Sequence, residues 1–151
     1  MRIILSRKGF DSSSGGRPSP ILADGRMVSL PIPDEQSPIR YMDIRWKEYN
    51  LGDLVSDLTN GRVPASSSAH LDPDINCESL SRHAEWRPIF GQIGAAQGHL
   101  RKNNVQPGDI FLFFGLYQKV INFPPGSSTG TLTPGDGMYC GAGSKLTPSS
   151  P

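Results

Sequence analysis

Residues 110–114 read Ile-Phe-Leu-Phe-Phe and form the most hydrophobic run of the chain. They follow residues 106–109, Gln-Pro-Gly-Asp, a sequence typical of a turn. A short, continuous apolar run bounded by a turn predicts a central β-strand that is buried on both faces. The rest of the fold is expected to assemble around this strand.

Two further segments are predicted to join it in a sheet. Residues 2–5 form a short apolar strand at the start of the chain. Residues 20–32 form a hairpin, because Asp24-Gly25 between two apolar runs favours a type I′ turn, which has positive φ at both central residues.

Two helices are predicted to cover the sheet. Apolar residues recur at i, i+3, i+4 and i+7 over residues 51–58, with Asn50 as the N-cap and Asn60-Gly61 as the stop. Residues 92–102 form the second helix. The fold class is therefore expected to be α+β, with two or three helices covering a mixed or antiparallel sheet made of residues 2–5, 20–32 and 109–115.

The composition changes after Phe123. Residues 124–151 consist mainly of Gly, Pro, Ser and Thr, which cannot fill a core, so a disordered low-complexity tail is predicted there. The chain is accordingly divided into one domain, residues 1–123, and the tail.

The overall composition narrows the class of protein. Hydrophobic residues make up 36% and charged residues 19%, while 17 Gly and 14 Pro favour many turns and little helix. A net charge of +1 provides no global basic field for nucleic acid, although a local patch of four cations is possible. These are Arg2, Arg7, Lys8 and Arg17.

Neither a disulfide framework, a zinc site nor a membrane anchor is indicated. Cys77 and Cys140 are too few and too far apart for the first two. No signal peptide is recognised, and no apolar run approaches the roughly 18 residues of a membrane helix. We therefore expect a cytoplasmic protein.

The loop at residues 6–19 is the first candidate site. Glycine-rich backbone amides together with Lys8 and Arg17 suit a phosphate, and Asp11 could orient a sugar hydroxyl or act as a general base. The alternative is a structured turn in which Asp11 and Ser12 bond local amides. No Walker or dinucleotide-binding spacing is present, and no cofactor is specified. The candidate residues are Lys8, Asp11, Ser12, Gly15, Gly16, Arg17 and Ser19.

The second candidate is His-Leu-Asp-Pro-Asp at residues 70–74. His70, Asp72 and Asp74 could supply an acid–base pair, or two or three ligands to a divalent cation, of which we favour the catalytic role. Asp72 as an N-cap with Pro73 at the first helical position is the structural alternative.

A third set consists of Arg87, Gln92, Gln97 and His99. Glutamine side chains can bind a base edge through paired donor and acceptor groups, and Arg87 could bind phosphate. The alternative is a helix with small residues that pack closely and glutamines that satisfy buried backbone groups.

Six motifs in this order resemble the nucleotide modification associated domain 3 family over about residues 1–120. They are Ser-Arg-Lys-Gly-Phe-Asp-Ser at 6–12, Gly-Gly-x-Pro-Ser-Pro-Ile-Leu at 15–22, Ser-Leu-Pro-Ile-Pro-Asp at 29–34, His-Leu-Asp-Pro-Asp at 70–74, Gly-Gln-x-Gly-Ala-Ala-Gln-x-His-Leu at 91–100 and Gly-Asp-Ile-Phe-Leu-Phe-Phe-Gly at 108–115. The resemblance implies a bacterial or phage protein linked to DNA-base or nucleotide modification. Because such proteins continue beyond the last motif with further strands and helices, it also implies a truncated or frame-shifted member.

The expected function is to bind a nucleotide-like, phosphate-bearing ligand within a DNA-base or nucleotide modification system, with other proteins of that system as possible partners. Lys8 and Arg17 would hold the phosphate, with His70, Asp72 and Asp74 across the pocket. Two alternatives are a non-catalytic nucleic-acid-binding module and an inactive truncated fragment. The residues do not decide whether the protein is an enzyme.

Overall fold

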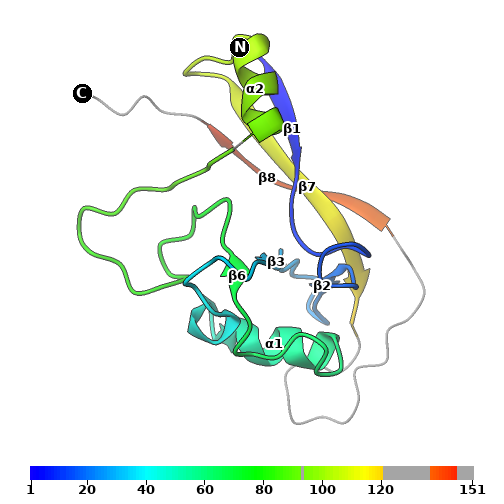
Figure 1. Cartoon of the computed structure of the whole chain (residues 1–151). Helices are drawn as coiled ribbons and strands as arrows, with labels where there is room; N and C mark the ends of the chain where they lie inside the picture. Colours follow the sequence, from blue (N-terminus) through cyan, green and yellow to red (C-terminus); the bar gives the residue numbers. More distant parts are fainter. Residues whose placement is uncertain (93, 121–136, 146–151) are drawn as a thin grey trace.

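The computed structural model describes residues 1–92, 94–120 and 137–145 (Figure 1). Its elements follow the chain in this order: β1 (Ile3–Arg7), β2 (Ser19–Ile21), β3 (Ile32–Pro33), the 3₁₀-helix η1 (Tyr41–Asp43), β4 (Arg45–Trp46), β5 (Tyr49–Asn50), α1 (Leu51–Leu58), β6 (Ala69–His70), α2 (Gly94–Lys102), β7 (Ile110–Lys119) and β8 (Gly137–Lys145). Helices and mixed sheets occur together, so the predicted α+β class is confirmed.

The main sheet is mixed and has β7 at its centre. β1 pairs in parallel with the first half of β7, from Ile3 opposite Ile110 to Arg7 opposite Phe114. β2 pairs in parallel with the end of β7, and β8 runs antiparallel along the other edge. β1 ends beside the middle of β7, and β2 pairs with the end of β7, so the predicted ligand loop at residues 6–19 connects two strands that both pair with β7 (Figure 1).

The prediction that this central strand is buried on both faces is wrong. Phe111 and Phe113 are buried on one face, where both rings contact Phe90. On the other face Leu112 is half-buried, and its partner in register, Leu5, is 64% exposed. The reason is that the second helix does not cover the sheet.

α2 begins at Gly94, and residue 93 lies outside the described residues. The helix has no buried residue, so the prediction that it covers the sheet is also wrong. Its composition explains the result, because Leu100 is the one large apolar residue of Gly94–Lys102, so the helix has little apolar area to bury. In the described part of the chain, no helix is both long and apolar enough to span a membrane.

The turn at Asp24-Gly25 forms, but not as predicted. Ile21 and Met27 make an antiparallel bridge, and Leu22 receives a hydrogen bond from Gly25 N at 2.9 Å. Only Gly25 has positive φ, at +83°, so the type I′ geometry is wrong. The second arm forms no ladder beyond that bridge, and its end, β3, pairs instead with β6 in a separate two-stranded sheet.

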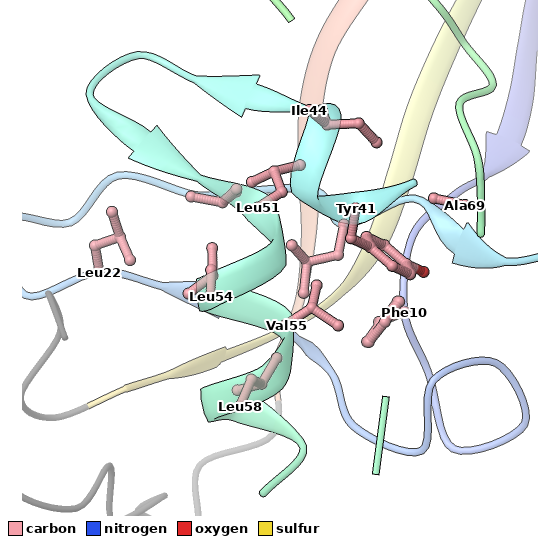
Figure 2. Packing of buried hydrophobic residues seen from close by; sticks show 11 residues of the cluster. Phe10, Leu22, Tyr41, Ile44, Leu51, Leu54, Val55, Leu58 and Ala69 are labelled. Carbon is pink, nitrogen blue, oxygen red and sulfur yellow. The ribbon is translucent and has the colours of Figure 1, made fainter. Parts of the chain in front are cut away.

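The core lies between α1 and the segments packed against it, most of which precede it in the chain, as Figure 2 shows. Helix α1 has the predicted bounds, and the Asn50 side chain accepts hydrogen bonds from Gly52 N and Asp53 N. Asn60 and Gly61 end it with positive φ, as predicted. Its apolar face packs on a cluster that includes Phe10, Leu22, Val28, Leu30, Tyr41, Ile44 and Ala69.

Within the segment predicted to be a tail, Gly137–Lys145 forms β8. β8 pairs with β7 from Ile110 opposite Lys145 to Tyr117 opposite Gly137. The free edge of β7 offers unpaired backbone donors and acceptors, and a segment poor in apolar side chains can satisfy these through its backbone alone. The remaining predicted tail residues, 124–136 and 146–151, lie outside the described residues.

Candidate functional site

A cavity of about 790 Å³ lies where the loop after β1 meets the segment after β6. Lys8 and Asp11 line it from the first segment, and His70, Asp72 and Asp74 line it from the second. The floor includes Phe113 and Tyr117 of β7 and Ile44 of the core. Members of two of the three predicted sets of site residues therefore meet in one cavity.

Lys8 and Asp72 form the inner ion pair of the cavity. The Lys8 ammonium lies 2.8 Å from Asp72 Oδ2, and the two side chains are 15% and 14% exposed. The backbone N–H of Lys8 donates to Phe114 O at 2.8 Å, which fixes the residue at the end of β1. Gly91 N donates to Asp72 Oδ1 at 3.0 Å, and the Phe90 ring lies 4.6 Å from the ammonium. Both charges are thus already held by protein groups.

Asp11 is anchored within its own turn. Its Oδ1 accepts hydrogen bonds from the Ser13 hydroxyl and from the backbone N–H groups of Ser13 and Ser14, all at 2.7–2.8 Å. Its Oδ2 lies 2.8 Å from Arg7 Nη2. Burial alone would raise the pKa of Asp11, but these hydrogen bonds and the Arg7 charge hold that pKa below its ordinary value. A carboxylate stabilised in this way is a poor proton acceptor.

The glycines and serines of this loop serve the turn. Gly15 has φ +88°, and a Cβ on it would lie 2.4 Å from the Phe10 ring. Gly16 also has positive φ, at +76°. The buried Ser19 hydroxyl accepts from Phe10 N at 3.3 Å and from Leu30 N at 3.2 Å, while Ser12 is exposed.

Arg17 is separate from this cavity. It does not line the cavity, and its Nε is buried with no hydrogen-bond partner among the residues that the structure describes. The structure therefore does not bring Arg17 together with Lys8 at a common phosphate site.

Within residues 70–74, the first and last residues, His70 and Asp74, each have a charged partner. His70 Nδ1 lies 2.9 Å from Asp34 Oδ2 at the cavity rim. Asp74 is bound by Arg82, which also contacts Ser79 Oγ at 3.0 Å. Backbone bonds between Asp74 and Ile89, at 2.7 and 2.8 Å, hold the following chain against this segment.

The third predicted set is not part of the cavity. Gln97 and His99 are exposed on α2, and Arg87 is exposed with its Nη1 bonded to Trp86 O at 3.0 Å. Gln92 is half-buried and does not line the cavity either. These four residues do not meet the other candidates.

The family model for nucleotide modification associated domain 3 matches residues 2–135. The chain belongs to this family. The match includes every candidate residue above and continues past residue 123. Neither a curated protein nor a solved structure matches the chain.

In this nucleotide modification associated domain, the β4–β5 hairpin supplies cavity residues that sequence reasoning missed. Arg45 and Trp46 line the cavity, and Asn76 lines it from the segment after β6. The Trp46 ring stacks on Tyr49 at 17°, with their centroids 6.1 Å apart. The sequence does carry a signal for this hairpin. Trp46 and Tyr49 flank Lys47-Glu48, and a short hairpin with aromatic residues on both arms places these two rings side by side.

Arg45 differs from the other cations of the cavity. Its side chain has no hydrogen bond or ion pair within the described part of the domain, whereas Lys8 and Arg7 are each paired with a carboxylate. The described residues contain no group of three or more His, Cys, Asp or Glu side chains placed to hold a metal ion. The site therefore offers charge and hydrogen bonding from side chains.

Proposed function

We propose that this domain binds a nucleotide unit carrying a single phosphate, free or within nucleic acid, as part of a nucleotide or DNA-base modification system. The observation that carries the proposal is the cavity, in which Lys8 and Asp72 join segments far apart in the sequence. Membership of a family of nucleotide modification associated domains supplies the context.

The dimensions and walls of the cavity suit such a ligand. A volume of about 790 Å³ lies within the range of roughly 300–1,000 Å³ that is typical of small-molecule sites. Trp46 and Tyr117 offer aromatic surface to a base, and the Asn76 amide offers both a donor and an acceptor. Arg45 offers an unpaired guanidinium to a phosphate.

The charge balance favours one phosphate over three. Lys8 and Arg7 neutralise Asp72 and Asp11, and Arg82 neutralises Asp74, so the unpaired Arg45 is the remaining cation among the lining residues described. A triphosphate would bring several negative charges close to carboxylates that already have partners, and like charges at short range repel.

The ion pairs of Arg7 and Lys8 give less support to a general nucleic-acid-binding module. Such a module would need a contiguous basic face, but Arg7 and Lys8 are paired and Arg17 lies elsewhere. Arg2 is at the other end of β1, where its guanidinium bonds Asn104 O at 2.9 Å.

A thermal-shift series tests the proposal. The purified chain would be melted with each 2′-deoxynucleoside 5′-monophosphate, the matching triphosphates and a short duplex DNA. We expect one or more monophosphates to raise Tm more than the triphosphates do, because a ligand that binds the folded state stabilises it. An equal or larger shift with triphosphates would contradict the single-phosphate proposal.

A matched pair of variants tests the residues. Arg45→Ala should abolish the shift with monophosphate, whereas Arg101→Ala, on the exposed α2, should leave it unchanged. A shift produced by DNA alone and lost at high salt would favour the nucleic-acid-binding module. The lack of a cooperative melt would favour an inactive fragment.

A further inference from the structure

The His70 side chain is held by Asp34 from a neighbouring strand. His70 belongs to β6, which pairs antiparallel with β3 so that His70 lies opposite Ile32. Asp34, directly after β3, continues this pairing, because its backbone N–H donates to Ser68 O at 3.1 Å. His70 Nδ1 and Asp34 Oδ2 are 2.9 Å apart as a result of this register.

The Asp34 carboxylate is itself fixed. Its Oδ1 accepts a hydrogen bond from Gln36 N at 3.0 Å, which leaves Oδ2 for the imidazole. The hydrogen bond from His70 and that from Gln36 hold the pKa of Asp34 below its ordinary value, so the carboxylate is charged at neutral pH. A charged carboxylate at Nδ1 favours the tautomer with the proton on Nδ1 and the lone pair on Nε2.

The lone pair on Nε2 is available at the cavity. His70 lines the cavity, is 48% exposed in its side chain, and has no hydrogen-bond partner at Nε2 within the described residues. A contact between side chains as exposed as these contributes little to stability, so stability alone does not account for the fixed geometry.

We propose that Asp34 and His70 form a proton-accepting pair in which His70 Nε2 takes a proton from a hydroxyl group or a water molecule at the bound ligand. Asp34 is the positioning residue, and its carboxylate stabilises the imidazolium that forms. The step moves one proton from that oxygen to Nε2 and breaks only the O–H bond; the oxygen anion that remains is the stronger nucleophile. This inference rests on the proposed nucleotide site.

Two other charged residues, Asp72 and Arg40, lie next to β6, the first in the sequence and the second through backbone pairing. Asp72, two residues further on, donates its N–H to His70 O at 3.0 Å, and its carboxylate holds Lys8. Arg40 lies where its backbone bridges Ser68, next to β6. Asp34 is therefore the carboxylate that contacts the imidazole.

Carbethoxylation with diethyl pyrocarbonate tests the pair, because the reagent acylates an unprotonated imidazole nitrogen. The chain has three histidines, and His83 and His99 serve as internal references in peptide mapping. We expect His70 to react several-fold faster than either. Asp34→Asn should reduce the His70 rate to the reference rate, whereas Glu35→Gln, at the exposed neighbouring carboxylate, should not.

A second measurement does not depend on reactivity. Nitrogen-15 NMR of the wild-type imidazole should show the proton on Nδ1 of His70, and Asp34→Asn should shift population toward the Nε2-protonated tautomer. A wild-type His70 that carries its proton on Nε2, or that reacts no faster than the references, would overturn the inference.

Protection of His70 by a bound monophosphate distinguishes the Asp34–His70 proposal from the proposed nucleotide site. The four 2′-deoxynucleoside monophosphates should slow carbethoxylation of His70 and leave His83 unaffected. Fast, Asp34-dependent reaction without protection by any of them would overturn the proposed nucleotide site while the pair itself stands. Protection without dependence on Asp34 would overturn the role of Asp34 and support the site.

Discussion

The ammonium of Lys8 and the carboxylate of Asp72 lie 2.8 Å apart, although the residues are 64 positions apart in the chain. With only 15% and 14% of these side chains exposed, the pair is screened from water. It joins the end of β1 to the segment after β6, and both segments line the cavity. The geometry of the candidate site therefore depends on this contact.

The two charges should be energetically coupled. Lys8→Met or Asp72→Asn alone leaves a partly buried charge without its partner and should reduce the free energy of unfolding by about 2–4 kcal/mol. The double variant should be less destabilised than the sum of the two single variants. Urea unfolding of the four proteins measures the coupling, and additive effects would contradict it.

Asp11 should make stability depend on pH. Because its pKa in the folded state lies below the ordinary 3.8, its contribution is complete above that value and is lost as the pH falls through the lower folded pKa. Asp11→Ala should cost about 1–2 kcal/mol at pH 7 and progressively less below about pH 4. Unfolding at several pH values tests this, with Glu85→Ala at an exposed position as the control.

Two glycines of similar conformation should respond differently to alanine. Gly25→Ala, at φ +83° with nothing within 4 Å of the new Cβ, should cost about 1 kcal/mol. Gly15→Ala, at φ +88°, adds a clash with the Phe10 ring and should cost a further 1–3 kcal/mol or so. Equal losses of Tm would indicate that the ring moves freely out of the way.

The two tryptophans provide an optical test of the cavity. Trp46 lines it and Trp86 does not, so a monophosphate should change the fluorescence of Trp86→Phe, which retains Trp46. The converse variant, Trp46→Phe, should show no change on titration. A response confined to Trp86 would place the ligand outside the cavity.

Local sequence determined the elements whose signals lie within a few residues. Asn50 caps α1 through its side chain, and Asn60 with Gly61 ends it, because capping needs only neighbouring backbone groups. The apolar run at residues 110–114 forms the central strand, because its side chains favour a buried strand in almost any context.

The candidate site could be predicted only in part. The polar loop after the first strand pointed to Lys8, and the alternating His and Asp at residues 70–74 pointed to Asp72, but nothing in the sequence indicates that these two residues are partners. Arg45 and Asp34 were missed because each becomes relevant through a neighbour that is distant in the chain, the cavity wall for Arg45 and His70 for Asp34.

The sequence by itself thus determined α1 with its caps, the central strand and the membership of a nucleotide modification associated family. Only the tertiary structure decided that the sheet keeps one apolar face partly uncovered, that Gly137–Lys145 is a strand, and that Asp34 holds His70 at the cavity rim. The physical reason is that strand pairing and ion pairs are long-range contacts. Their partners are chosen by the register of β7 with β1 and of β3 with β6, and no local pattern encodes that register.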